Sequence, residues 1–201
     1  MAESWGSWGI RWPGPPEKTG APGAVANRIA GAVVHSAEGS LDAALSVLGG
    51  PTRSSWHLTI AKDGRYVQHY PLEAVTWHAG ADANPRLVGI ELEGVAGEEL
   101  TGAQFDCLVN VLRWIGAVGS WATFERHVTL FEHNEFMATA CPSGRVPWGP
   151  LIEALAGPLP PALIDLLRGL TAAAHFARMG WNLRDLSEQD KAAVRWIAAQ
   201  L

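Results

Sequence analysis

Three residues that lie far apart in the sequence have the side chains of a zinc site. His35 ends the apolar run IAGAVVH, His133 follows a second apolar run, and Cys141 comes eight residues later in HNEFMATACP. Catalytic zinc takes three protein ligands from histidine, cysteine and carboxylate, and leaves a fourth position for water. Two imidazoles and one thiolate meet this requirement, which makes a metal site the leading interpretation.

Cys141 also has two other interpretations. It can be a small core residue, which is the role that we assign to Cys107 within an amphipathic helical pattern. It can also be a nucleophile paired with a histidine. Spacing alone does not separate the three possibilities.

The elements that must position these side chains are predicted from the hydrophobic periodicity and from the cap and turn residues. An Asp-Gly pair between two strand-like runs indicates a hairpin. Thr101 with Gln104 predicts a capping box at the start of a helix. The expected elements are strands at 29–35, 88–93 and within 127–135, a hairpin centred on 62–64, and helices that begin after Ser40 and Thr101.

The interleaving of strands and helices predicts an α/β fold with a central mixed β-sheet flanked by helices. We expect three parts. Residues 1–27, rich in proline, glycine and tryptophan, read as an extended arm on the surface, and residues 28–156 as the catalytic domain. Residues 158–201 read as a short C-terminal helical extension, which we expect to cap the sheet rather than to serve as a targeting module.

The composition excludes several classes of protein. A net charge of −5 argues against binding to a nucleic-acid backbone. No apolar run reaches the roughly 18 residues of a membrane span, so no stable membrane insertion is expected. The N-terminus lacks the pattern of a Sec signal peptide, which predicts synthesis in a cytoplasm. We expect a monomer.

Five motifs resemble those of one family in order and spacing. VVHSAEG, SSWHLTIAKDGRYVQHY, VTWHAG, LVGIELEG and HNEFMATACPSG are similar to segments of the zinc-dependent N-acetylmuramoyl-L-alanine amidases of type 2. This family includes phage endolysins, cytoplasmic muropeptide-recycling amidases and peptidoglycan recognition proteins. The resemblance covers about residues 28–155, and the pattern is most similar to phage endolysins with a cysteine zinc ligand.

The resemblance implies roles for individual residues. The zinc (Zn²⁺) ligands fall on His35, His133 and Cys141, and the catalytic acid of the recycling enzymes falls on Glu91. Glu91 would take a proton from the attacking water and pass one to the leaving nitrogen.

Further positions of the family lie around the substrate. His78 matches a position that lines the substrate cleft. The chain departs from the cysteine-type phage amidases at Trp56, where they carry tyrosine, and at Thr139, where they carry lysine. Thr139 is therefore a candidate oxyanion donor, and Trp56 and His57 are candidate substrate contacts.

The implied function is hydrolysis of the amide bond between N-acetylmuramic acid and the L-alanine of the stem peptide. The setting that we favour is a phage endolysin, which acts on the cell wall after release from the cytoplasm. The alternatives are a cytoplasmic muropeptide-recycling amidase, a peptidoglycan-binding module without activity, and a cell-wall peptidase with Cys141 as its nucleophile.

Overall fold

The structure is a computed structural model and describes residues 3–20 and 26–157. Within these ranges, six strands form one mixed sheet in the order β1-β4-β3-β5-β2-β6. The strands are β1 (Ile10–Arg11), β2 (Gly31–Ser36), β3 (Leu58–Ile60), β4 (Tyr66–Gln68), β5 (Leu87–Leu92) and β6 (Leu130–Glu132). The predicted α/β class with a central mixed sheet is confirmed. The predicted C-terminal extension, 158–201, lies outside the described residues.

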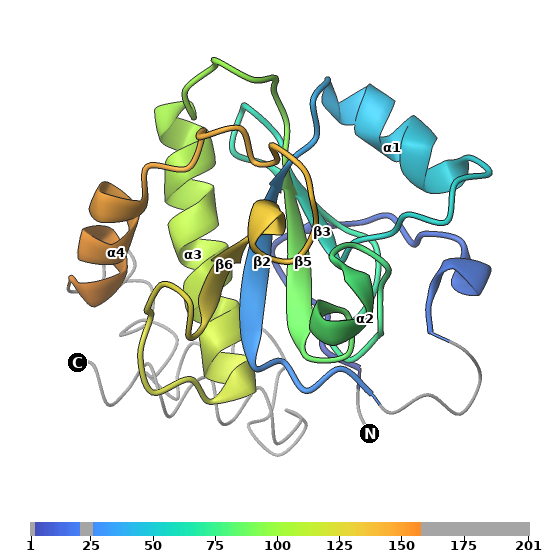
Figure 1. The fold of residues 1–201 in the computed structure, drawn as a ribbon, viewed down its shortest axis with the longest axis horizontal. Coiled ribbons are helices and arrows are strands. Elements are labelled where there is room, and N and C mark those ends of the chain that lie inside the picture. Colours follow the sequence, from blue (N-terminus) through green and yellow to red (C-terminus); the bar gives the residue numbers. More distant parts are fainter. Residues whose placement is uncertain (1–2, 21–25, 158–201) are drawn as a thin grey trace, which may run out of the picture.

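Helices flank this sheet on both sides, with α3 and α4 side by side on one flank and α1 and α2 on the other (Figure 1). Within the described ranges, none of them is both long enough and apolar enough to cross a bilayer. The helices are α1 (Leu41–Gly49), α2 (Gly80–Ala83), α3 (Gly102–Gly119) and α4 (Trp148–Ala156), with 3-10 turns η1 (Pro16–Lys18) and η2 (His133–Glu135).

The register of the central strands places the side chains of the main core on one face of the sheet and those of His35 and Glu91 on the other. Val34 pairs with Ile90, and Ile90 pairs with Leu58; all three belong to the main core, which also contains Leu108, Leu112 and Ile115 of α3. One residue further along, His35 pairs with Glu91, which pairs with Thr59. Because side chains alternate along a strand, this second row faces away from α3.

Local sequence signals explain the helix and hairpin boundaries. The Ser40 side chain accepts a hydrogen bond from the Ala43 amide and caps α1. Gly64, at φ +85°, closes the β3–β4 hairpin at the predicted Asp-Gly pair. Thr101 caps α3 as predicted.

The predicted capping box at Thr101 is only half present. The Gln104 amide donates to the Thr101 side chain. The Gln104 side chain donates instead to the carbonyls of Ile60 and Glu93, at 3.0 and 2.9 Å. These carbonyls lie at the end of β3 and directly after β5. The Gln104 side chain therefore links α3 to the sheet and does not complete the capping box.

The N-terminal arm does more than cover the surface, because it adds the edge strand β1, parallel to β4. Its glycines permit close packing: a Cβ on Gly9 would lie 2.2 Å from the Tyr66 ring, and one on Gly14 would lie 2.3 Å from the Tyr70 hydroxyl. Lys18 is buried, and its Nζ donates to the carbonyls of Val47 and Leu48 at the end of α1.

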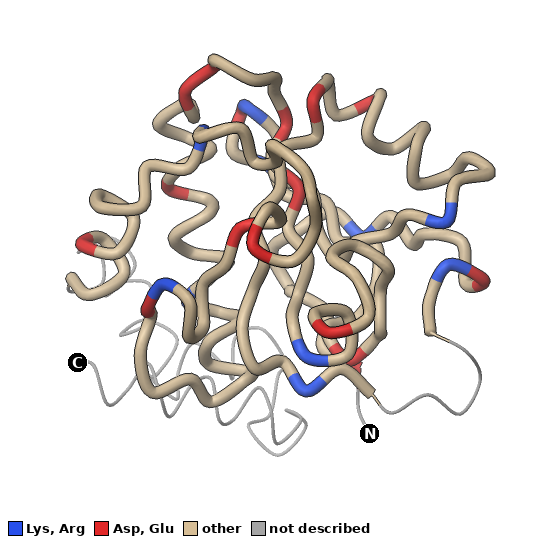
Figure 2. Tube along the Cα trace, in the orientation of Figure 1, with Lys and Arg blue, Asp and Glu red and all other residues tan. Residues whose placement is uncertain are grey.

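Charged residues of both signs are scattered over the described chain, as Figure 2 shows. Ion pairs between them are few and mostly local, such as Arg65 with Asp63 at 2.7 Å. This distribution agrees with the modest net charge of −5.

Candidate metal centre

His35 lies at the carboxyl end of β2, where the strand leaves the core. The strand is buried along its whole length, which is why its sequence is almost continuously apolar. The imidazole is 2% exposed, and burial together with the neighbouring His78 and His133 lowers its pKa well below the usual value. His35 is therefore neutral, as a metal ligand must be.

His133 begins the short turn η2 directly after β6. The turn is held by a capping box, in which the Glu132 and Glu135 side chains each accept from the other's backbone amide. Arg126 makes an ion pair with Glu135 at 2.7 Å, and Trp148 of α4 donates to Glu132. These contacts fix the backbone on which the His133 ring is carried.

Cys141 lies in the loop that follows η2, and two backbone contacts hold it near His35. Its Sγ accepts from the Ser36 amide at 3.2 Å, and its carbonyl accepts from the Asn134 amide at 3.0 Å. Burial raises the pKa of the Cys141 thiol to about 12, with smaller contributions from acidic neighbours including Glu91.

The three side chains meet in one place. One ligand atom each from His35, His133 and Cys141 lies within 4.8 Å of the others, and the His35 and His133 ring centroids are 4.5 Å apart. A set of two nitrogens and one sulfur is typical of catalytic zinc. The residues present therefore fit a zinc ion.

A hydrogen-bonded relay fixes which nitrogen of His35 faces this site. His78 Nε2 lies 3.2 Å from the Leu87 carbonyl and donates to it, so His78 Nδ1 is an acceptor. His35 Nε2 lies 3.0 Å from that Nδ1 and is the donor. The lone pair of His35 Nδ1 is left for a metal; histidine ligands commonly donate their other ring N–H to a neighbouring acceptor in this way.

Glu91 lies beside His35 across the β2–β5 pairing. The carboxyl group is partly buried, and its Oε2 has no contact with solvent and no hydrogen-bond partner among the described residues. Burial raises the pKa of Glu91 to about 8, and the negative charge of Glu38 adds to the rise. Perturbed carboxyl groups of this kind are typical of general acids and bases.

The structure places His57 and Trp56, two of the candidate substrate contacts, inside the protein. His57 has no exposed surface, and its ring nitrogens bond to the Ala74 carbonyl, the Thr76 hydroxyl and the Gly89 amide. Trp56 is 5% exposed and donates to Thr59. Both side chains make internal hydrogen bonds, and their assignment as substrate contacts stays a prediction.

His78 also lies deeper than predicted. It is 8% exposed, and both of its nitrogens are used in the relay behind His35. A Cβ on Gly89 would lie 2.7 Å from the His78 ring, so this glycine gives the ring its place over β5. The His78 ring is thus in a position to orient His35, and its assignment as a muropeptide contact stays a prediction.

Thr139, by contrast, is exposed two residues before Cys141. Its Oγ1 accepts from the Cys141 amide at 3.2 Å, which leaves its hydroxyl proton free to donate to another group. Its assignment as an oxyanion donor stays a prediction.

Sequence reasoning missed four residues around the Cys141 loop. Glu38 accepts from the Ser143 hydroxyl, and Arg145 bonds to Ser36, which contacts the Cys141 sulfur. No spacing or motif distinguished Arg145 from an ordinary surface arginine. The one available signal was Glu38, whose position three residues after His35 places it near the same strand end.

The sequence profile of N-acetylmuramoyl-L-alanine amidases matches residues 25–144. This match covers more than half of the chain and includes all three candidate ligands. The chain therefore belongs to the N-acetylmuramoyl-L-alanine amidase family. No curated protein matches it.

Solved structures with the same fold carry names from this family. N-acetylmuramoyl-L-alanine amidase LysC from Clostridium intestinale URNW superposes with a TM-score of 0.56 at 21% identity, over 73% of this chain and 95% of its own. A mutant endolysin from Bacillus subtilis gives 0.58 at 20%, over 73% and 97%. The Ph2119 endolysin from a Thermus scotoductus MAT2119 bacteriophage gives 0.53 at 16%, over 71% and 93%.

Proposed function

We propose that this chain is a zinc amidase that cleaves the bond between the lactyl group of N-acetylmuramic acid and the L-alanine of the stem peptide. Family membership supports the reaction. The observation that carries the proposal is the convergence of His35, His133 and Cys141 within 4.8 Å. Glu91 lies in the adjacent strand position, and its Oε2 has no hydrogen-bond partner among the described residues.

In the proposed mechanism His35, His133 and Cys141 hold zinc, and His78 orients the His35 ring. Bound zinc would polarise the scissile carbonyl and acidify water. Glu91 accepts the proton of the attacking water and returns a proton to the nitrogen of L-alanine as that nitrogen leaves. The Thr139 hydroxyl donates to the oxyanion, a weaker donor than an ammonium group would be.

The raised pKa of Glu91 suits this role. A carboxyl group with a pKa near the working pH can both take up and release a proton. A dication at the three ligands would lower the pKa of Glu91 and favour the form that accepts a proton.

The peptidase alternative is disfavoured by the environment of Cys141. Cysteine nucleophiles lie in electropositive surroundings that lower the thiol pKa. Here burial and nearby carboxylates raise the pKa of the Cys141 thiol, and His35 directs its Nε2 to His78 rather than to the sulfur.

The non-catalytic binding module is disfavoured because the cysteine ligand is present.

We further propose that the chain acts on intact cell wall as a phage endolysin. The support comes from solved structures that are named endolysins and are covered over nearly their whole length. A cytoplasmic recycling amidase, with soluble muropeptides as its substrates, is the alternative.

Cys141→Ser tests the site directly. We expect the variant to lose bound zinc and to release no stem peptide from a purified muropeptide, because a hydroxyl is a far weaker zinc ligand than a thiolate. Zinc content and product release measure the two effects. Cys107→Ser in α3 is the matched control and should keep both; an active, metal-free Cys141→Ser variant would refute the assignment.

A further inference from the structure

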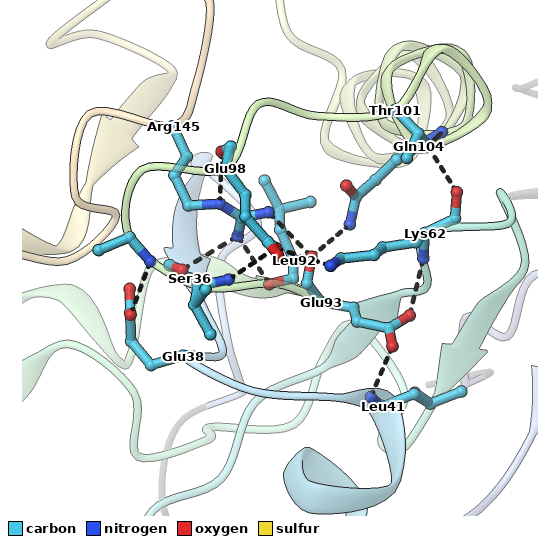
Figure 3. A network of polar contacts seen from close by, with 12 residues as sticks. Ser36, Glu38, Leu41, Lys62, Leu92, Glu93, Glu98, Thr101, Gln104 and Arg145 are labelled. Atoms are coloured by element: carbon cyan, nitrogen blue, oxygen red, sulfur yellow. Dashed lines mark hydrogen bonds and ion pairs between the residues drawn. The ribbon is translucent and has the colours of Figure 1, made fainter.

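Arg145 lies four residues after Cys141 and is buried, with 5% of its surface exposed. Figure 3 shows its guanidinium between three backbone segments. It donates to the Ser36 hydroxyl at 3.0 Å and to the carbonyls of Leu92, Glu93 and Glu98 at 3.2, 2.9 and 3.1 Å. A planar guanidinium carries five N–H donors in fixed directions, which is enough for these four acceptors.

Two of these acceptors belong to the strand ends that carry the candidate site. Ser36 follows His35 on β2, and Leu92 follows Glu91 on β5; the two residues also pair with each other in register. Arg145 thus joins β2 and β5 one residue beyond the proposed ligand and the proposed proton carrier.

The same guanidinium is connected to the Cys141 sulfur through Ser36. The Ser36 hydroxyl accepts from Arg145, and the Ser36 amide donates to Cys141 Sγ at 3.2 Å. Between the two ends, the Ser143 amide donates to the Ala140 carbonyl and the Arg145 amide to the Pro142 carbonyl. The loop from Cys141 to Arg145 is therefore hydrogen-bonded to Ser36 through the side chains of its first and last residues.

The backbone leaves space for the guanidinium at Gly94. A Cβ on this residue would lie 2.2 Å from Arg145 Nη2, and its φ of +128° is one that side chains rarely adopt. Glycine at this position therefore permits both the turn after β5 and the contact with Arg145.

We propose that Arg145 is a positioning residue that holds the Cys141 sulfur at the metal site by tying its loop to the ends of β2 and β5. The proposal rests on the metal assignment of the proposed function. Its role is indirect, because Arg145 acts through Ser36 and the loop backbone.

Arg145→Lys tests this role. It keeps the positive charge but replaces the guanidinium, with its five N–H donors, by an ammonium group whose three N–H donors cannot reach all four acceptors. We expect the zinc dissociation constant, measured by competition with a chromogenic chelator, to rise by about 10- to 100-fold. In the metal-free protein we expect several-fold faster alkylation of Cys141, measured by peptide mass spectrometry. The buried Cys107 serves as the internal reference.

Three further variants separate positioning from general stability. Ser36→Ala removes one acceptor of Arg145 and should shift both readouts in the same direction by less. Lys62→Met breaks the exposed Lys62–Glu98 pair of the same network and should shift neither. Leu155→Ala lowers stability in the α3–α4 core and should leave zinc affinity unchanged.

The outcomes are distinct. Unchanged zinc affinity and unchanged Cys141 alkylation in Arg145→Lys would overturn the proposal, as would an equal loss of affinity in Leu155→Ala. If the wild type itself bound no zinc, the metal assignment would fail. The alkylation of the metal-free protein would then still decide whether Arg145 positions Cys141.

Discussion

Glu91 holds a carboxyl oxygen that neither solvent nor a described side chain reaches, in the strand position next to His35. Burying a carboxyl group without a partner costs free energy, and the cost appears as a raised pKa. Its strand neighbour Glu93 differs, because its two oxygens accept from the amides of Leu41 and Lys62. Two glutamates of one motif therefore have different environments: Glu91 has an unpartnered buried oxygen, and Glu93 holds two backbone amides.

Glu91→Gln should lower kcat by about 10²- to 10⁴-fold while zinc stays bound, because the amide keeps the shape but cannot exchange the proton. Steady-state hydrolysis of a muropeptide and metal analysis measure the two quantities. Glu93→Gln, the same change two residues away, should leave kcat within a few-fold of the wild type. Comparable kcat losses in both variants would contradict the separate roles.

Sequence motifs identified the residues that meet at this site but not the direction in which every side chain points. His35, His133 and Cys141 follow strand ends or adjoin one, so their convergence could be predicted. His57 and His78 stand in motifs of the same family, yet both are buried and use their nitrogens internally. A motif reports the position along the chain, whereas burial depends on the loops that cover the sheet.

At the scale of elements, the parallel pairing of β2 and β5 in register places His35 beside Glu91. The apolar strand patterns, the Ser40 cap and the Asp-Gly turn made these elements predictable. Strand β1 was not predictable, because only two residues pair within a segment rich in proline and glycine. The segment around β1 packs on Tyr66 and Tyr70, which lie more than 50 residues away in the sequence. A local sequence pattern cannot predict such a contact.

Lys18→Met tests whether the N-terminal arm stabilises the fold. The buried ammonium donates to two carbonyls at the end of α1, where a cation is also favoured by the helix dipole. We expect a loss of about 1–3 kcal/mol in the free energy of unfolding, measured with urea, and an unchanged kcat.

Arg65→Met is the matched control for Lys18→Met, because its ion pair with Asp63 is exposed and exposed pairs contribute little to stability. Equal stability of Lys18→Met and the wild type would show that the arm is not anchored through this residue.

At the scale of the whole molecule, buried neutral histidines link stability to pH. His57 Nδ1 accepts from the Gly89 amide, so a proton on that nitrogen would oppose the N–H of Gly89. Burial lowers the pKa of His57 to about 4 and that of His69 to about 4. In the unfolded chain both histidines titrate near their ordinary pKa of about 6.5.

Between pH 6.5 and 4 the unfolded chain therefore binds more protons than the folded one, so stability falls as the pH falls. The loss is on the order of 1.4 kcal/mol per pH unit for each histidine. Urea unfolding of the metal-free protein at pH 7, 6 and 5 measures it. His69→Gln should reduce the slope by about the share of one histidine; an unchanged slope would show that His69 is not held neutral.

The most direct test of the account is mass spectrometry of the products released from purified peptidoglycan sacculi. The protein is assayed as isolated, after chelation, and after zinc is restored. We predict intact stem peptides with a free L-alanine amino group, lost on chelation and regained with zinc, while the glycan strands stay uncut. Stem peptides released in the presence of chelator, or no release from protein that still sediments with the sacculi, would contradict the account.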